Sequence, residues 1–245
     1  MKSIIWFKND LRIDDNPAMR AACDSSTEVH AIFLYSKDQL QKHNEANVKL
    51  DFLIENLKSL SDSLKKLNVS LSIMTSSGFD EDPEIILKIT KERDVDKVFF
   101  NKQFGEDEQK RDKKVISILE ASGIKAEFFN DQIVYEAGSI RTGQDNPYSV
   151  FTPFKRKWVE NFDMEFLDIE HKYTPMAQGN ISPNISSLNF DFKKEHKVDM
   201  SIWPAGEQAA ADRLKNFLEN KASNYSKDRN DPIIDGTSRM SPYLA

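Results

Sequence analysis

The last stretch of the sequence, residues 225–245, is dense in groups that bind phosphate. Gly236 allows the backbone to turn tightly or to approach a ligand closely. Hydroxyl groups and a planar five-donor guanidinium, all suited to phosphate oxygens, are carried by Thr237, Ser238, Ser241 and Arg239. Pro242 then fits the first turn of a helix, whose N-terminus would add backbone N–H groups. Taken alone, the pattern favours a polar loop that caps a helix over a phosphate site.

A second polar group follows two of the apolar runs that we interpret as strands. His43 comes after the second run, and Asp107 and Glu108 come after the fourth, in the stretch NKQFGEDE. Such loops meet at one edge of a parallel sheet, where a histidine, amides and carboxylates could bind a heterocycle through paired hydrogen bonds. The residues alone favour another interpretation, in which Asp107 and Glu108 lie in the first turn of a helix, where negative charge is stabilising.

Few other residues are candidates for a catalytic or metal-binding role. Asp10 and Arg12 could be catalytic, but a structural ion pair beside the first strand is the preferred interpretation. The histidines have no metal-ligand spacing to one another or to Cys23, so no metal site is predicted; they are His30, His43, His171 and His196. The sequence contains no nucleophile elbow, no P-loop and no G-x-G-x-x-G fingerprint after the first apolar run, which disfavours an ordinary dinucleotide site.

The composition excludes several classes of protein. A net charge of −6 and a pI near 5.4 argue against a strong nucleic-acid binder built from this segment alone. The single cysteine, Cys23, allows no intrachain disulfide and indicates a reducing compartment. No apolar run approaches the roughly 18 residues that span a bilayer, and the N-terminus has the pattern of a strand and not of a signal peptide. We therefore expect a cytoplasmic monomer without a membrane partner.

Short apolar runs alternate with amphipathic stretches and would position these residues. The runs that predict strands are residues 4–7, 29–35, 70–74, 97–100 and 125–129. Asn16 and Pro17 predict the cap and the first residue of a helix after the first run. The alternation predicts an α/β fold with a doubly wound five-stranded parallel sheet. Ligands of such folds bind at the carboxyl ends of the strands, here in the loops after Phe7, Tyr35 and Phe100.

The pattern also divides the chain into three parts. They are an α/β domain at 1–130, a long linker at 131–203 with one short helix near 154–162, and the beginning of a helical domain at 204–245 with a helix at 207–220. Turn signals and a polar composition mark the linker, and the apolar face of the last helix marks the second domain.

Four stretches, in order along nearly the whole chain, together resemble the DNA photolyase and cryptochrome family. WFKNDLRIDDNPA at 6–18 resembles the family's opening W-F-R-x-D-L-R-x-x-D-N-x-A. YSVFTPFK at 148–155 and WPAGE at 203–207 resemble its linker and the entry to its helical domain. GTSRMSPYL at 236–244 resembles G-T-S-R-L-S-x-x-L. The likeness is in particular to bacterial cyclobutane pyrimidine dimer photolyases with a folate antenna.

This resemblance implies a light-driven enzyme. In the family, an N-terminal α/β domain holds an antenna pigment, often methenyltetrahydrofolate, which passes excitation energy to FAD in a C-terminal helical domain. Reduced, excited FAD then donates an electron to a pyrimidine dimer in damaged DNA, the dimer splits, and the electron returns. Base flipping is the general route to a lesion inside a duplex, and photolyases are among its known users. The flavin supplies the chemistry, and the protein supplies position and electrostatics.

The resemblance also implies roles for residues by their positions. Those that fall on FAD-contacting positions, chiefly around the phosphates, are Tyr225, Thr237, Ser238, Arg239, Met240 and Ser241, with Met240 in place of the usual Leu. Arg229 falls on a position that contacts the DNA backbone, with a surface salt bridge as the alternative. His43 and Glu108 match antenna-folate positions. Asp107 stands where folate-binding relatives have Asn, and this exchange of an amide for an acceptor-only carboxylate argues against tight folate binding.

The chain departs from the family in length, since family members are roughly twice as long. We therefore expect residues 204–245 to be the truncated beginning of the FAD domain. We expect this chain alone to hold no catalytic residue, to bind FAD weakly and to be inactive in repair. A cryptochrome-like blue-light photoreceptor is the first alternative, which dimer-splitting activity of the intact protein would exclude. A free-standing antenna or folate-binding module without catalysis is the second.

Overall fold

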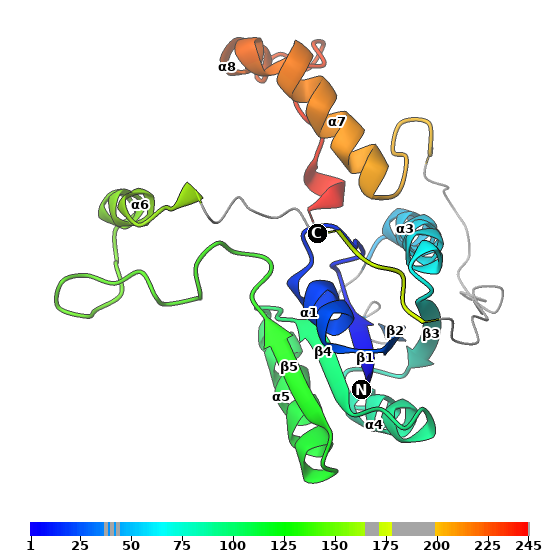
Figure 1. The fold of residues 1–245 in the computed structure, drawn as a ribbon. Coiled ribbons are helices and arrows are strands. Elements are labelled where there is room, and N and C mark those ends of the chain that lie inside the picture. Colours follow the sequence, from blue (N-terminus) through cyan, green and yellow to red (C-terminus); the bar gives the residue numbers. More distant parts are fainter. Residues whose placement is uncertain (37–38, 40–41, 43–44, 165–171, 178–198, 245) are drawn as a thin grey trace.

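The computed structural model describes residues 1–36, 39, 42, 45–164, 172–177 and 199–244. In this part of the chain, five strands form one parallel sheet in the order β3-β2-β1-β4-β5 (Figure 1). The strands are β1 Lys2–Phe7, β2 Glu28–Ser36, β3 Ser70–Ser76, β4 Lys97–Asn101 and β5 Lys125–Phe129. All five expected strands are present, and each neighbouring pair runs parallel.

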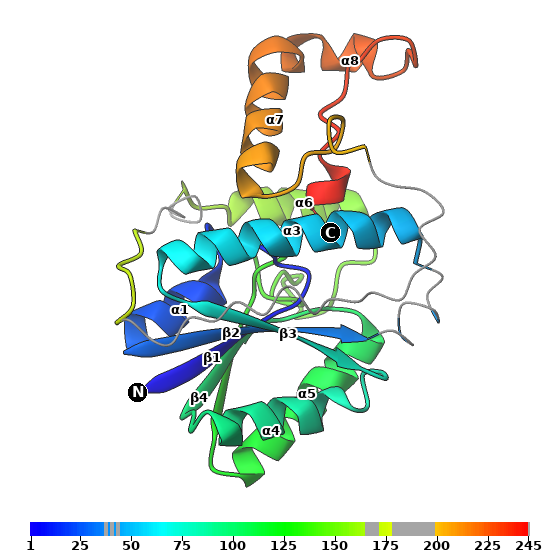
Figure 2. The ribbon, with the colours of Figure 1, turned by 90° about the vertical axis from the view of Figure 1, so that its right-hand side faces the viewer.

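Helices cover both faces of the sheet (Figure 2). One face carries α1, Pro17–Ser25, and α3, Asn47–Lys66; the other carries α4, Asp82–Glu92, and α5, Glu106–Ala121. The chain winds from β1 to β3 in one direction and then returns to the other side of β1 for β4 and β5. This confirms the doubly wound α/β arrangement, and its reversal point lies between β1 and β4.

The first strand is buried on both faces because the sheet lies between two helical layers. Ile5 and Phe7 belong to the apolar cluster with α1 and α3, whereas Ile4 and Trp6 belong to the cluster with α4 and α5. All four side chains are at most 1% exposed. Alternate residues of one strand thus serve two separate cores, which explains the continuously apolar run in the sequence.

Local signals in the sequence account for α1 and α3. The Asn16 side chain accepts a hydrogen bond of 3.0 Å from the backbone N–H of Met19, and Pro17 opens the helix, as predicted. In α3, leucines recur at steps of three to seven residues and are buried against the sheet; they are Leu50, Leu57, Leu60 and Leu64. The apolar stripe therefore determines which face of α3 packs on the sheet.

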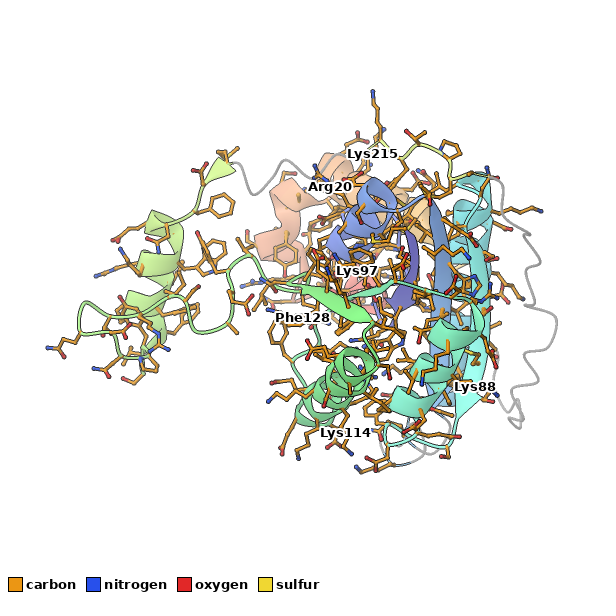
Figure 3. The ribbon with its side chains drawn as sticks, turned by 60° about the horizontal axis from the view of Figure 1, so that its bottom comes forward. Arg20, Lys88, Lys97, Lys114, Phe128 and Lys215 are labelled. Atoms are coloured by element: carbon orange, nitrogen blue, oxygen red, sulfur yellow. The ribbon has the colours of Figure 1, made fainter. Side chains whose placement is uncertain are left out.

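The carboxyl ends of the central strands meet at one edge of the sheet. Phe7 lies opposite Phe33 in β2, and Trp6 lies opposite Phe100 in β4. The loops after β1, β2 and β4 therefore leave the sheet side by side, as the sequence predicted. β5 forms one lateral margin of the sheet, where Phe128 is 42% exposed (Figure 3).

Beyond β5 the regular elements of the described chain are all helices, and they lie outside the α/β layers (Figures 1 and 2). Its elements are α6 Phe151–Glu160, α7 Glu207–Asn220, the 3₁₀ turn η3 Ala222–Asn224, α8 Tyr225–Asp228 and the 3₁₀ turn η4 Ser241–Tyr243. α7 has the predicted bounds. No helix in the described residues is both long enough and apolar enough to cross a membrane.

The linker helix begins earlier than the sequence pattern indicated. α6 starts at Phe151 and not near Phe154, so Pro153 lies inside its first turn. A proline is tolerated there because the first N–H groups of a helix have no partner within the helix. The division into domains at 1–130, 131–203 and 204–245 agrees with the order of these elements and stays a prediction.

Candidate functional site

A buried lysine lies at the reversal point of the sheet. The Lys8 ammonium is 2.6 Å from the Asp112 carboxylate of α5 and donates to the Asn101 carbonyl oxygen at 3.1 Å. It also lies over the rings of Trp6 and Phe100, at 4.3 and 4.2 Å from their centroids. Burial, partly offset by Asp112, lowers the pKa of Lys8 to about 8. Lys8 therefore ties β1 to α5.

Asp10 and Arg12 both have structural partners, but they do not form the ion pair with each other that the sequence favoured. The Asp10 carboxylate accepts hydrogen bonds from the Asn101 amide at 2.7 Å and from the Lys8 backbone N–H at 2.8 Å. Arg12 forms an ion pair with Asp131 at 2.6 Å, so its partner lies 119 residues away and is not Asp10. The two residues hold the loop between β1 and α1 against β4 and the start of the linker.

A further polar cluster closes the sheet edge between α4 and α5. Asp82 accepts from the Ser76 hydroxyl at 2.6 Å and from the Ser36 hydroxyl at 3.3 Å, and Arg111 lies 3.9 Å away. Burial raises the pKa of Asp82 above its ordinary value. Arg111 also donates to Asp112 at 2.8 Å. These groups satisfy one another, so they support the edge and are not presented to a ligand.

Two of the three predicted antenna residues, Asp107 and Glu108, lie at the start of α5. Asp107 forms an ion pair with Lys42 at 3.0 Å, which joins a residue that follows β2 to the helix after β4. Both side chains are partly exposed, at 40% and 64%. Lys42 was missed by the sequence interpretation because its partner lies 65 residues away. His43, the remaining antenna candidate, lies outside the described residues.

Glu108 differs from its neighbours in the first turn of α5. Glu106 pairs with Lys110 at 2.5 Å, whereas Glu108 makes no hydrogen bond or ion pair in the described part of the chain. Its carboxylate folds over Gly105, where an added Cβ would lie 2.0 Å from Oε2. The helix N-terminus stabilises these carboxylates, which confirms their expected place in the first turn of a helix, whereas the binding of a ligand stays a prediction. Glu108 is the half-buried carboxylate that is free to accept hydrogen bonds from a ligand.

The predicted flavin residues lie in a turn that packs on α8. Gly236 is buried, and an added Cβ would lie 2.6 Å from Asp228 Cβ, so the close approach expected at this glycine is to α8. Arg239 has a left-handed backbone with φ of 51°, which is uncommon outside glycine. Its guanidinium forms an ion pair with Asp235 at 2.9 Å. Ser241 opens the short 3₁₀ turn that Pro242 predicted.

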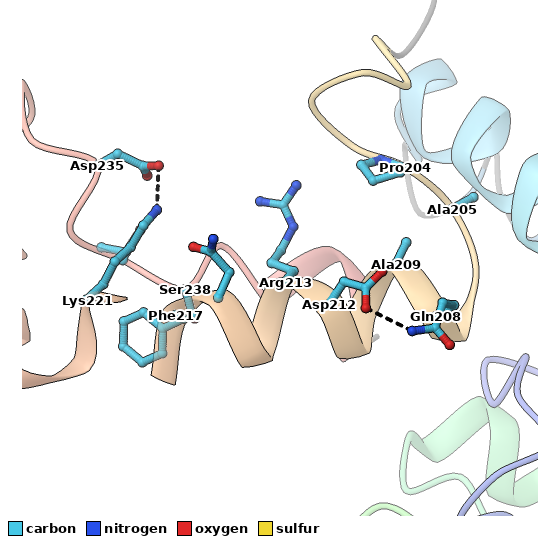
Figure 4. Close-up of a pocket in the computed structure, with 12 residues that line it drawn as sticks. Pro204, Ala205, Gln208, Ala209, Asp212, Arg213, Phe217, Lys221, Asp235 and Ser238 are labelled. Carbon is cyan, nitrogen blue, oxygen red and sulfur yellow. Dashed lines mark hydrogen bonds and ion pairs between the residues drawn. The ribbon is translucent and has the colours of Figure 1, made fainter. Parts of the chain in front are cut away.

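A cavity of about 650 Å³ separates this turn from α7 (Figure 4). Its lining includes two predicted FAD residues, Thr237 and Ser238, and two cations that the sequence interpretation missed, Arg213 and Lys221. Only the apolar face of α7 entered the prediction from the sequence. A polar stripe on the same helix, with Gln208, Asp212 and Asn216 at steps of four, would have indicated a second, hydrated face.

The cations of this cavity already have protein partners. Lys221 donates to Asp235 at 2.6 Å, and this hydrogen bond is the main reason why the pKa of Asp235 lies below its ordinary value. Arg213 lies over Trp203 at 5.0 Å and donates to the Ile202 carbonyl, and its buried Nε has no partner. Hydroxyls and partly neutralised cations fit a phosphate group, with Asp235 as the competing anion.

The other predicted residues lie nearby on α8 and the following turn. Tyr225 is 40% exposed and packs edge-on against Phe217 of α7 at 5.8 Å. Arg229 is exposed, and its guanidinium lies 5.5 Å from the Tyr225 ring. Within the described residues Arg229 has no carboxylate partner, so the alternative of a surface salt bridge is not realised there. Met240 is half-buried and precedes the last 3₁₀ turn.

Comparison with known proteins places this geometry in context. Residues 3–176 match the family described as DNA photolyase. The chain is 31% identical to the deoxyribodipyrimidine photo-lyase of Vibrio cholerae, over 99% of this chain and 52% of that protein. It is 30% identical to the deoxyribodipyrimidine photo-lyase of Escherichia coli, over 99% of this chain and 51% of that protein. The chain thus spans about half the length of the curated relatives it matches.

Solved structures show the same fold. A bacterial class III photolyase from Agrobacterium tumefaciens matches with a TM-score of 0.73 and 23% identity, over 99% of this chain and 50% of that one. A cryptochrome from Synechocystis matches with a TM-score of 0.74 and 20% identity, over 100% and 52%. An archaeal photolyase from Sulfolobus tokodaii, solved with two FAD molecules, matches with a TM-score of 0.70 and 20% identity, over 100% and 51%.

Proposed function

Because the chain belongs to the DNA photolyase family, we propose that it is the antenna-domain part of a light-driven enzyme that splits cyclobutane pyrimidine dimers in DNA. The match of nearly the whole chain to relatives named deoxyribodipyrimidine photo-lyase carries this proposal. In it, the α/β domain holds the antenna pigment, and the helical segment, residues 203–244, contributes part of the FAD site. The protein acts in the cytoplasm as a monomer, in keeping with its composition.

The flavin role rests on the turn that faces α7. Thr237 and Ser238 would donate their hydroxyls to the FAD diphosphate across the cavity, and Arg213 and Lys221 would supply positive charge. Arg239 would exchange Asp235 for a phosphate oxygen, and its strained backbone is typical of a ligand-binding position. Tyr225, Met240 and Ser241 would complete this part of the site. When bound and reduced, FAD would supply the light-driven electron transfer.

The antenna role rests on the carboxylates at the start of α5. Glu108 has free acceptor oxygens for the amino group and ring N–H of a pterin such as that of methenyltetrahydrofolate. Lys42 neutralises Asp107, which offsets the loss of the amide found in folate-binding relatives. The pair would leave one anionic acceptor, Glu108, for the neutral donors of the pterin. His43, which lies outside the described residues, would be the third folate-binding residue.

The DNA role rests on Arg229. Its guanidinium is exposed and has no carboxylate partner among the described residues, so it could bind a backbone phosphate. Damaged DNA would be held chiefly by parts of the enzyme that correspond to the second half of the relatives. An overall charge of −6 agrees with a minor share of DNA binding by this segment.

A repair assay tests the proposed reaction. The reading frame would be expressed with all the sequence that follows codon 245, and light-dependent splitting of a thymine dimer in an oligonucleotide would be measured by chromatography. We expect splitting under blue or near-ultraviolet light and none in the dark. A purified flavoprotein that binds the oligonucleotide but leaves the dimer intact would favour the photoreceptor alternative instead.

A binding titration tests the antenna role on the present chain. Methenyltetrahydrofolate fluorescence would be measured with wild type, Glu108→Ala and the matched control Glu106→Ala, which removes a carboxylate from the same helical turn. We expect Glu108→Ala to weaken binding at least about tenfold, because a charged acceptor of two hydrogen bonds is lost, and Glu106→Ala to have little effect. Equal affinities in all three proteins would remove Glu108 from the site.

A further inference from the structure

The helical segment contacts the α/β domain through its first residues. Glu207, the first residue of α7, accepts hydrogen bonds on one carboxylate oxygen from the backbone N–H groups of Ile13 and Asp14, at 3.0 and 2.9 Å. These two N–H groups belong to the loop between β1 and α1, nearly 200 residues earlier in the chain. The contact is partly buried, and burial raises the pKa of Glu207 above its ordinary value. A single side chain therefore joins the start of α7 to the sheet edge.

A second contact runs along the outer side of α3. Phe52, Asn56 and Ser59 are spaced by four and three residues, so they form one stripe on that helix. Asn56 accepts a 2.9 Å hydrogen bond from the Gly206 backbone N–H, and its own amide donates to the Phe52 carbonyl at 2.8 Å. Phe52 packs edge-on against Tyr243 at 5.5 Å. The stripe thus receives both ends of the helical segment.

Gly206 fits the surface of α3 because it has no side chain. Its φ is 98°, which only glycine adopts readily, and an added Cβ would lie 2.2 Å from the Ser59 hydroxyl. Tyr243 returns to the same place and donates to the Pro204 carbonyl at 2.7 Å. The entry to α7 is therefore fixed in both backbone direction and position.

Beyond its first residues, α7 is tied to the α/β domain indirectly, through Arg213, whose guanidinium lies 5.7 Å from the ring of Tyr243. The helix has no buried residue. Fourteen residues correspond to a length of about 21 Å, so a swing of about 20° at its first turn moves its far end by about 7 Å. The far end leads into α8 and then into residues 236–241, the turn that carries most of the predicted FAD residues and is called the flavin turn below. The contacts at Gly206 and Glu207 thus determine where this turn lies relative to the α/β domain.

We propose that Glu207 is a positioning residue that orients α7 on the α/β domain and so sets the separation between the flavin turn and the antenna site. Excitation transfer falls steeply with distance and depends on the relative orientation of the two pigments, so a fixed α7 would make the transfer reproducible. The assignment of the two sites rests on the proposed function, whereas the orientation of α7 does not. The acceptor oxygen is what matters, because it binds two N–H groups.

Spin-label distances test the orientation directly. Labels would be placed at Lys88→Cys on α4 and Lys215→Cys on α7, whose side chains are 76% and 72% exposed, in a Cys23→Ala background (Figure 3). We expect a single narrow distance distribution in the wild-type background. Glu207→Ala should broaden it about twofold or more. Glu207→Gln keeps an acceptor oxygen and should preserve it, and Glu219→Ala, a surface change on the same helix, should have no effect.

Amide exchange gives a second, residue-specific readout. The Ile13 and Asp14 amides should exchange about tenfold faster in Glu207→Ala, since each loses its acceptor, while the thermal midpoint of the α/β domain stays unchanged. Asn56→Ala removes the side chain on α3 that accepts from the Gly206 N–H, and it should also broaden the distance distribution. A narrow, unshifted distribution and protected amides in Glu207→Ala would overturn the proposal. Neither measurement contains flavin or folate, so this result is separate from any failure of the proposed function.

Discussion

The α/β domain, from β1 to β5, and the helical segment, residues 203–244, support their candidate sites in opposite ways. In the described chain, every buried apolar side chain lies between Ile4 and Ile124. In the helical segment, α7 has no buried residue, and Ile233 and Leu244 beside the flavin turn are 92% and 77% exposed. The antenna candidates thus lie on a closed core, and the flavin candidates lie on an open surface.

The difference shows how far each candidate site is supported by the described chain itself. The α/β domain buries apolar area on both faces of its sheet, and each Å² contributes about 25 cal/mol. The helical segment relies on its contacts with α3 and on ion pairs such as Lys221–Asp235, which are worth little when exposed. The antenna candidates are therefore held by the core of this chain itself, whereas we expect the flavin turn to be fully organised only when further surface covers it.

The largest expected effect compares two ion pairs of equal length. Lys8–Asp112 and Lys221–Asp235 both measure 2.6 Å, but the first pair is 4% and 11% exposed and the second 27% and 51%. Asp112→Ala removes the nearest carboxylate from two buried cations, Lys8 and Arg111, and should lower the free energy of unfolding by about 4 kcal/mol. Asp235→Ala should lower it by less than about 1 kcal/mol. Urea unfolding followed by circular dichroism measures both.

Similar losses in the two variants would contradict the contrast between the regions. If Asp112→Ala failed to fold, Asp112→Asn would provide the intermediate case, because its amide oxygen still accepts from Lys8. Glu106→Ala, which breaks an exposed pair on α5 with side chains 63% and 82% exposed, is the control inside the stable domain. It should behave like Asp235→Ala, since the exposure of an ion pair, and not its place in the fold, determines how much the pair stabilises the protein.

These pairs also show what the sequence could and could not predict. The strands, the cap at Asn16 and the helix bounds of α7 follow from local patterns, and all are present. The partner of Lys8 lies 104 residues away in the chain, and no local pattern identifies it. Thr237 and Ser238 were singled out because hydroxyls beside a glycine suggest phosphate, and their role stays a prediction. Arg213 and Lys221 were missed because only the folded chain brings α7 to that turn.

The next largest effect on stability is expected when a leucine is replaced on α3 and, for comparison, on α7. Leu57 of α3 is fully buried, and Leu218 of α7 is 61% exposed. Leu57→Ala should cost about 3 kcal/mol, because it removes apolar contacts and leaves a cavity in the core. Leu218→Ala should change the unfolding free energy by less than about 0.5 kcal/mol. A large loss in Leu218→Ala would show that this face of α7 is covered in solution, for example by a second copy of the chain.

A smaller effect on stability depends on pH and is expected only in the α/β domain, where Lys8 is buried. Lys8 has a pKa near 8 in the folded chain against 10.5 ordinarily, so between these values the unfolded state binds more protons. Stability linked to this group must therefore rise with pH from about 8 to 10.5, by about 1 kcal/mol per pH unit. Lys8→Arg keeps the charge but does not titrate there, so the difference between wild type and variant isolates the effect. Parallel stability curves would show that Lys8 titrates normally.

The smallest effect on global stability is expected at Gly236, where the local effect is large. An added Cβ would lie 2.6 Å from Asp228 Cβ, so Gly236→Ala must push the flavin turn away from α8. Gly143, with no atom within 4 Å of an added Cβ, provides the matched control. Because the turn lies outside the core, Gly236→Ala should shift the unfolding free energy by less than about 0.5 kcal/mol. Amides from Asp228 to Ser241 should exchange faster in Gly236→Ala and not in Gly143→Ala. A cooperative loss of stability on the scale of Leu57→Ala would mean that the helical segment unfolds together with the α/β domain, and the two regions would then have to be treated as one folding unit.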